Sequence, residues 1–170
     1  MLTKTSKLKA CCFIEHQPQI LKLNFNEKDV DIIKFKKMVQ RITINLIENY
    51  SVNHYISGVS LGIGQYVSET VLELKKQYPH ITLECAIPYE RQAENWTEAQ
   101  RNKYFSIIKD CDKETLLQFQ GTNDSIQNLY KYMTKNSYYI VHIYHKDHNG
   151  ITKDNDWLEI QGENVFAIHL

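Results

Sequence analysis

The sequence has 170 residues, 42% of them hydrophobic, which suffices for one core and is too short for two ordinary domains, so we expect a single domain over residues 1–170. Its 20 basic and 20 acidic side chains cancel, which excludes a net field that would attract bulk nucleic acid or an anionic membrane. The chain shows neither an N-terminal signal pattern nor an apolar stretch of about 20 residues, and this predicts a cytoplasmic protein without a membrane span.

Hydrophobic periodicity predicts that strands and helices alternate along the whole chain. In chain order we expect a strand at Leu8 to Ile14, a helix at Asp29 to Asn49, a strand at Tyr55 to Ser57, a helix at Gln65 to Gln77, a strand at Ile81 to Ile87, a helix from a capping box at Thr97 to Lys109, a strand at Glu114 to Phe119, a helix at Asn123 to Lys135, a strand at Tyr138 to Tyr144, a short helix at Asp156 to Gln161 and a strand at Val165 to His169. This alternation predicts an α/β, three-layer Rossmann-like fold with a mainly parallel sheet. Ligands of such sheets bind beyond the carboxyl ends of the strands.

A glycine-bearing turn over Ser57 to Gly64 follows the second expected strand and opens a helix. Backbone N–H groups and the helix dipole favour an anion at such a position, and Gly58, Gly62 and Gly64 would let the backbone approach it closely. The turn lacks the third glycine of a dinucleotide fingerprint and the Lys-Ser or Lys-Thr of a Walker loop. It therefore predicts either a phosphate or nucleotide site, or a tight turn that needs glycine only for its geometry.

The same turn contains the pattern G-x-S-x-G, which is typical of the nucleophile elbow of serine hydrolases. Ser60 would be the nucleophile, and the downstream histidines would be candidate bases: His142, His145, His148 and His169. A serine hydrolase is an alternative on this ground. The even spacing of three of these histidines does not predict a metal site, because His142 and His145 would point to opposite faces of a strand.

Two further side chains stand where the third expected strand reaches the crevice end of the sheet. Gln92 and Trp96 lie in the loop that follows it, where an indole ring can stack on a nucleotide base. Glu84 lies about where a Rossmann acid would hold a ribose, but its place inside the strand favours a salt-bridged carboxylate.

The order of these motifs resembles the DUF1273 or YpsA-like branch of the SLOG superfamily, which is Rossmann-like and related to the lysine-decarboxylase-like phosphoribohydrolases. Cys11 to Pro18 looks like the family's C-F-T-G-H-R-P, and Ser57 to Gly64 looks like its S-G-x-A-L-G-x-D. Leu72 to Pro79 and Ile87 to Trp96 also match family segments. The resemblance implies a nucleotide-derivative ligand, such as a nucleotide or ADP-ribose, held by the loops after the first two strands.

The departures from the family pattern fall on polar and loop positions of the implied site. Glu15 and Gln17 replace a glycine and an arginine, and Gly64 replaces an aspartate. Leu129 to Lys131 replaces the family's R-N-R, which removes two more arginines. A charge-assisted contact stabilises a complex by roughly 1.5–3 kcal/mol, so these changes predict a weakened phosphate site. Whether Glu15 lies over the turn decides whether a phosphate fits there.

From these observations we expect a non-catalytic, nucleotide-derivative-binding or regulatory SLOG-like protein with a partly eroded ligand site. An N-glycosidic hydrolase acting on a nucleotide is the alternative, although the P-G-G-x-G-T-x-x-E pattern with its glutamate does not occur. We assign no catalytic residue and no metal site, and we leave a homo-oligomer open. The candidate ligand-binding residues are His16, Gln17, Ser57, Gly58, Ser60, Gly62, Gly64, Gln92, Trp96 and Ser125.

Overall fold

The computed structural model describes residues 9–15, 26–144 and 164–169, which form one parallel sheet flanked by helices. The strands are β1 (Ala10–Glu15), β2 (His54–Ser57), β3 (Thr82–Ile87), β4 (Lys113–Leu116), β5 (Tyr139–Tyr144) and β6 (Val165–His169). The helices are α1 (Val30–Tyr50), α2 (Ile63–Gln77), α3 (Glu98–Asp110) and α4 (Ser125–Lys135). The alternation expected from the sequence is confirmed. The expected helix at Asp156 to Gln161 lies outside the described residues.

The six strands lie in the order β4-β3-β2-β1-β5-β6, and every neighbouring pair is parallel. From β1 the chain moves outward through β2, β3 and β4, and β5 then pairs with the other side of β1. In the register between β1 and β5, Glu15 lies opposite Ile143. The direction of winding therefore reverses between these two strands, and in open α/β sheets such a reversal marks the ligand crevice.

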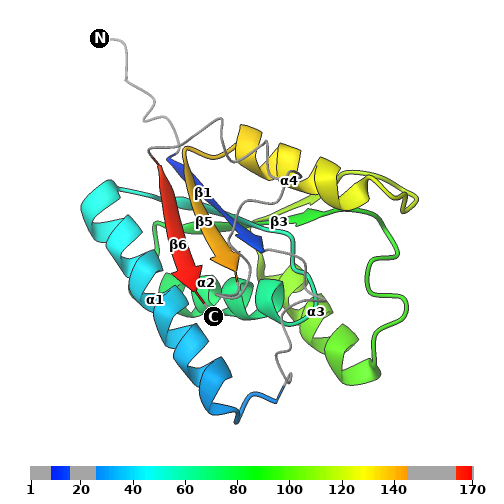
Figure 1. The fold of residues 1–170 in the computed structure, drawn as a ribbon, viewed down its shortest axis with the longest axis horizontal. Helices are drawn as coiled ribbons and strands as arrows, with labels where there is room; N and C mark the ends of the chain where they lie inside the picture. Colours follow the sequence, from blue (N-terminus) through cyan, green and yellow to red (C-terminus); the bar gives the residue numbers. More distant parts are fainter. Residues whose placement is uncertain (1–8, 16–25, 145–163, 170) are drawn as a thin grey trace.

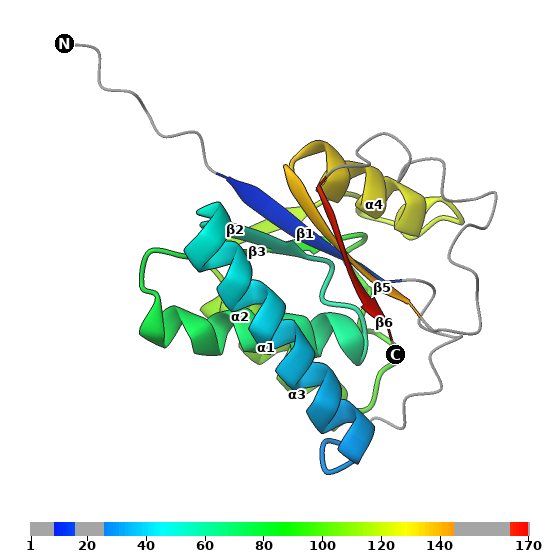
Figure 2. The ribbon, with the colours of Figure 1, turned by 60° about the vertical axis from the view of Figure 1, so that its left-hand side comes forward.

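Helices cover both faces of the sheet, as Figures 1 and 2 show. On one face lie α1, α2 and α3, with α2 between the other two, and on the opposite face lies α4. The fold is therefore a three-layer, Rossmann-like α/β arrangement.

The helices begin and end where the local sequence supplies caps. The Asp29 carboxylate accepts the N–H of Asp31 at 2.9 Å and starts α1, and Ser51, in the left-handed region with φ 57°, ends it. The expected capping box at α3 is confirmed, because the Thr97 hydroxyl and the Gln100 side chain bond each other's backbone N–H. Such caps each stabilise a helix by about 1 kcal/mol.

The core is divided by the sheet into two hydrophobic clusters. The larger one lies under α1, α2 and α3 and includes Phe13, Phe35, Tyr55 and Leu83. The smaller one lies under α4 and is formed by Cys12, Ile14, Ile56, Ala86, Leu129, Met133 and Ile140. Strand β1 contributes alternate residues to both clusters, as a fully covered parallel strand must. Among the residues described, no helix combines the length and the apolar character that crossing a bilayer requires.

Candidate functional site

The candidate site lies at the carboxyl edge of the sheet, where β1 ends at Glu15 and β2 runs into the turn at Ser57 to Gly64. The turn is built as the sequence predicts, with a glycine where the backbone needs one. Gly62 has φ 81°, which L side chains rarely adopt, and it is the N-cap of α2. Val59 also has a positive φ, of 50°, although a branched side chain disfavours it.

Hydroxyl groups hold the turn in shape from the inside. The Ser57 hydroxyl accepts the N–H of Val59 at 3.2 Å and donates to the carbonyl of Gly64 at 3.2 Å. The Ser68 hydroxyl, one turn along α2, contacts both Ser57 Oγ at 2.9 Å and the Gly64 carbonyl at 2.7 Å. Ser57 is buried, so we interpret it as a structural part of the turn.

Three N–H groups in the first turn of α2 already have partners within the turn. Gly64 donates to Ser60 Oγ at 3.2 Å, Gln65 donates to the Ser60 carbonyl at 3.1 Å, and Tyr66 donates to the Gly62 carbonyl at 2.9 Å. A phosphate at a helix N-terminus is bound by such N–H groups. Their internal use weakens the anion-binding capacity that the sequence pattern predicts.

Glu15 reaches the turn with its side chain. One carboxyl oxygen, Oε1, accepts a hydrogen bond from the Ser60 hydroxyl, whereas Oε2 is buried and has no hydrogen-bond partner in the described part of the chain. The residue is 8% exposed. Burial raises the pKa of Glu15 to about 8, because an ionised carboxylate is poorly solvated there. Glu15 therefore occupies the position beside Ser60, where a phosphate would have to displace it or lie against it.

Two glutamine side chains present further buried oxygens at the same edge. Gln92 Nε2 donates to the Gly58 carbonyl at 3.1 Å, which orients the amide, and Gln92 Oε1 has no partner among the described residues. Gln118 follows β4, and its carbonyl accepts the N–H of Glu90 at 3.2 Å. Gln118 Oε1 is likewise buried without a partner in the described ranges. The sequence pattern missed Gln118, because the fourth strand was expected to reach Phe119 and in fact ends at Leu116.

Helix α4 supplies two side chains that contact this edge, Leu129, where the resemblance places an arginine, and Tyr130, where it places an asparagine. A Cβ atom on Gly58 would lie 2.7 Å from Leu129 Cδ2, so Leu129 packs directly against the turn. The Tyr130 hydroxyl donates to the Glu15 carbonyl at 2.7 Å. A hydrophobic contact at Leu129 thus stands where the family pattern has a cation.

The remaining candidate residues have different positions. The Trp96 ring packs edge-on against Tyr104 of α3, with centroids 5.4 Å apart, and it adjoins the larger core cluster. Ser125 is buried at the start of α4, where its hydroxyl accepts the N–H of Thr122 at 2.8 Å. His16 and Gln17 lie outside the described residues. The structure therefore brings Glu15, Ser60, Gly58 and Gln92 together, while Trp96 and Ser125 make structural contacts.

The geometry around Ser60 bears on the serine hydrolase alternative. Its hydroxyl donates to Glu15 and accepts from Gly64, and neither partner is a histidine. His142 pairs with Ile14 in the sheet and stacks on Tyr144, so it lies on the α4 face, opposite to Glu15. His145 and His148 lie outside the described residues.

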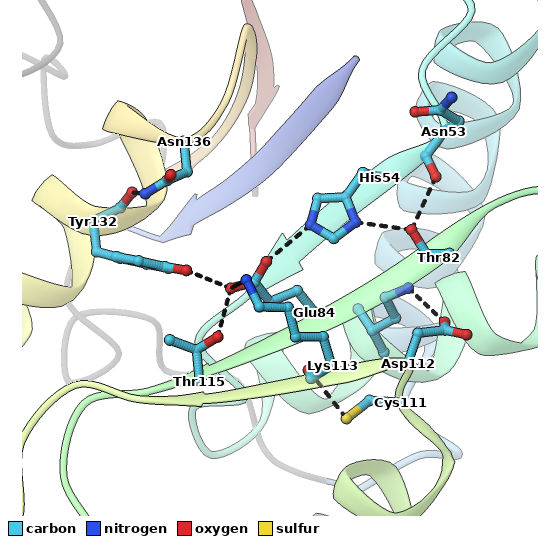
Figure 3. Close-up of polar contacts among 11 residues, drawn as sticks. Asn53, His54, Thr82, Glu84, Cys111, Asp112, Lys113, Thr115, Tyr132 and Asn136 are labelled. Atoms are coloured by element: carbon cyan, nitrogen blue, oxygen red, sulfur yellow. Dashed lines mark hydrogen bonds and ion pairs between the residues drawn. The ribbon is translucent and has the colours of Figure 1, made fainter. Parts of the chain in front are cut away.

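A second polar cluster surrounds Glu84 on the α4 face, near the amino ends of the strands (Figure 3). Glu84 Oε1 accepts from the Tyr132 hydroxyl at 2.6 Å and the Thr115 hydroxyl at 2.7 Å, and lies 3.2 Å from Lys113 Nζ. Glu84 Oε2 lies 2.9 Å from His54 Nε2. Burial by itself would raise the pKa of Glu84, but these bonds outweigh it and lower the pKa to about 2. The salt-bridged carboxylate expected at Glu84 is confirmed.

A broad groove of about 1070 Å³ lies on the helical side of the molecule, between α1, α2 and α3. Its walls carry charges of both signs, and two ammonium groups lie over the Tyr66 ring, Lys36 Nζ at 4.6 Å and Lys103 Nζ at 4.3 Å from its centroid. Lys103 also pairs with Glu27 at 2.6 Å and Glu69 at 2.9 Å. These charges satisfy one another, so the groove offers less for a ligand than the carboxyl edge.

Comparison with known proteins agrees with this architecture. The YpsA family model, described as the YspA SLOG family, matches residues 12–160. A UPF0398 protein of Lactobacillus acidophilus is 29% identical over 136 residues, which cover 76% of this chain and 70% of the relative. One from Ligilactobacillus salivarius is 31% identical over 137 residues, covering 76% and 71%.

A UPF0398 protein of Brevibacillus brevis is 38% identical over 88 residues, or 52% of this chain. The match spans 46% of that relative, so about half of its length has no counterpart in the alignment. The names of these relatives state no activity. The extent of the family match nevertheless leads to one conclusion, that the chain belongs to the YpsA family of SLOG proteins.

Proposed function

We propose that this protein binds a nucleotide derivative at the carboxyl edge of its sheet without transforming it, and that it acts as a regulatory or sensing protein. The supporting observation is the pair of unpartnered buried oxygens beside the turn, Glu15 Oε2 and Gln92 Oε1. A buried acceptor without a partner destabilises a fold by about 1–3 kcal/mol, so such atoms persist where a ligand or water satisfies them. Glu15 ends β1, one of the two strands between which the strand order reverses, and Gln92 follows β3 at the same carboxyl edge, where ligands of this fold usually bind.

Thermal unfolding in the presence of ligands tests the proposal. NAD, ADP-ribose, the ribonucleosides and their 5′-monophosphates are each added at millimolar concentration, and at least one is expected to raise the melting temperature. The ligand should be recovered intact after incubation, as judged by chromatography. If none of these compounds shifts the transition, the binding proposal is wrong and a structural or protein-contacting role takes its place.

An N-glycosidic hydrolase is the second candidate, and one observation favours it. The Glu15 carboxyl group, with a pKa of about 8, is largely protonated at neutral pH and has the proton that a departing base would require. The test is release of free base from a nucleoside 5′-monophosphate by the native protein and by Glu15→Gln. Base release that disappears in Glu15→Gln would replace the non-catalytic proposal with this one.

Labelling by a fluorophosphonate tests the serine hydrolase alternative. The Ser60 hydroxyl donates to a carboxyl group whose burial opposes ionisation, so it lacks a strong base. We expect no labelling of Ser60. A label that Ser60→Ala removes would establish the nucleophile elbow.

A further inference from the structure

The chemistry of the carboxyl edge also bears on which part of a ligand lies over the turn. Three side-chain oxygens there are buried and have no partner in the described part of the chain: Glu15 Oε2, Gln92 Oε1 and Gln118 Oε1. The two glutamine oxygens accept hydrogen bonds, and Glu15, whose pKa of about 8 leaves it largely protonated at neutral pH, can accept at one carboxyl oxygen and donate at the other. The Gln92 amide cannot simply be reversed, because its Nε2 already donates to the Gly58 carbonyl.

These oxygens belong to one connected part of the structure. Glu15 contacts the turn at Ser60, and Gln92 contacts the same turn at Gly58. The loop that carries Gln92 is joined to the residue after β4 by the bond from Glu90 N–H to the Gln118 carbonyl. The ends of β1, β3 and β4 therefore present buried carboxyl and amide oxygens around a turn whose own N–H donors at Gly64, Gln65 and Tyr66 are occupied.

A phosphate is a poor match for this arrangement. Its oxygens accept hydrogen bonds and carry negative charge, so they would meet the unpartnered amide oxygens of Gln92 and Gln118, and the Glu15 side chain already fills the position beside Ser60. Among the side chains that contact the turn, Leu129 is apolar and the Tyr130 hydroxyl is used by the Glu15 carbonyl. Hydroxyl, amino and ring N–H groups, by contrast, are the donors that the two amide oxygens lack, and a hydroxyl can also accept from the Glu15 carboxyl group.

We propose that the group over the Ser57 to Gly64 turn is the nucleoside part of the ligand, and that Glu15 excludes a phosphate from this position because its side chain fills it. Ribose hydroxyls or base N–H groups donate to Gln92, and ribose hydroxyls, which both donate and accept, hydrogen-bond with the Glu15 carboxyl group. This inference rests on the proposed binding function and specifies the ligand class of the same site. Glu15 is a positioning and specificity residue in this account.

The experiment compares dissociation constants for each ribonucleoside and its 5′-monophosphate by calorimetry. The native protein should bind the monophosphate no more tightly than the nucleoside. Glu15→Gly removes the carboxyl group and restores the glycine of the family pattern, so it should improve binding of the monophosphate relative to the nucleoside at least tenfold. Glu73→Gln, which neutralises an exposed carboxylate on α2, should keep the native ratio.

Each outcome decides the matter. A native protein that binds the monophosphate ten times more tightly than the nucleoside, with a ratio unchanged in a folded Glu15→Gly, would overturn this inference and leave the binding function standing. No binding of any nucleoside or nucleotide would overturn both. Because the native ratio is measured without a substitution, a variant that fails to fold does not remove the test, and Gln92→Leu, expected to weaken nucleoside binding several-fold, provides an independent variant.

Discussion

Glu15 is an acidic residue in a buried position, and its side chain also holds the glycine turn. It is buried at the end of β1, where an ionised carboxylate is disfavoured, and it holds Ser60 of the turn through a hydrogen bond. From the sequence, Glu15 was recognisable as an acid in place of a glycine. Its contact with Ser60 was not predictable, because it depends on the direction in which the turn after β2 projects toward β1.

The first prediction concerns the pH dependence of stability at Glu15. Its pKa in the folded protein, about 8, lies above its ordinary value of 4.5, so the folded state holds a proton that the unfolded chain releases. The contribution of Glu15 to stability is therefore fully present below about pH 4.5 and is lost as the pH rises through about 8. Glu15→Gln should remove this dependence.

Urea unfolding of the native protein and of Glu15→Gln at pH 5, 6, 7 and 8 measures this pH dependence of stability. The free energy of unfolding of the native protein, relative to the variant, should fall by as much as about 1 kcal/mol per pH unit. Glu73→Gln, at an exposed site, should run parallel to the native protein. Parallel curves for Glu15→Gln as well would mean that Glu15 is ionised in the folded state.

A second prediction at this scale concerns Gly58. Its missing Cβ leaves room for Leu129, so Gly58→Ala would place a methyl group 2.7 Å from Leu129 Cδ2. We expect a destabilisation of about 1–3 kcal/mol from overpacking. Adding Leu129→Val should recover part of this loss, and a double-mutant cycle in urea measures the coupling. Additive effects would show that the two side chains do not compete for the same space.

Helix α4 is the element that connects the two polar regions of the molecule. Its first turns pack Leu129 on the glycine turn and bond Tyr130 to the end of β1, whereas Tyr132 reaches Glu84 at the other end of the strands. The helix itself was predicted from periodicity, within two residues at its start. The sequence does not predict which tyrosines attach α4 to the sheet. Tyr130 and Tyr132 carry the same side chain and differ only in what lies beneath them.

Tyr132→Phe tests the anchoring of α4. The substitution removes the hydroxyl that donates to Glu84 Oε1 at 2.6 Å and leaves the ring in place. We expect a loss of about 1.5–3 kcal/mol in the free energy of unfolding, since the bond is made to a charged group. Tyr138→Phe is the matched control, because Tyr138 is 58% exposed, and should change stability by less than about 0.5 kcal/mol. Equal effects would refute the anchoring role.

At the scale of the whole molecule, Glu84 joins β2, β4 and α4 to β3. His54, Lys113, Thr115 and Tyr132 come from these other elements and all contact its carboxylate (Figure 3). The edge strand β4 is short and largely exposed, and this cluster adds side-chain bonds from Lys113 and Thr115 to its pairing with β3. Loss of the Glu84 charge should therefore lower the free energy of unfolding of the whole protein.

Acid unfolding measures the contribution of Glu84. Its folded pKa, about 2, lies below its ordinary value of 4.5, so its contribution is present above about pH 4.5 and is lost as the pH falls toward 2. Glu84→Gln should lose about 3 kcal/mol at pH 7, as when one partner of a buried ion pair is removed. The difference between the native protein and the variant should narrow from pH 5 to pH 2. A constant difference would mean that Glu84 does not titrate with folding.

The sequence by itself determined the alternation of strands and helices, the capping box of α3, the glycine turn and the family. These features depend on periodic burial and on hydrogen bonds between residues a few positions apart. Only the tertiary structure decided what the turn can bind. Ser60 meets Glu15 across 45 positions and Tyr130 meets it across 115, and such contacts follow from strand order and helix packing, which no local pattern encodes. For the same reason the turn that the sequence predicts as an anion site is, in the folded protein, flanked by the Glu15 carboxyl group, the amide oxygen of Gln92 and the apolar Leu129.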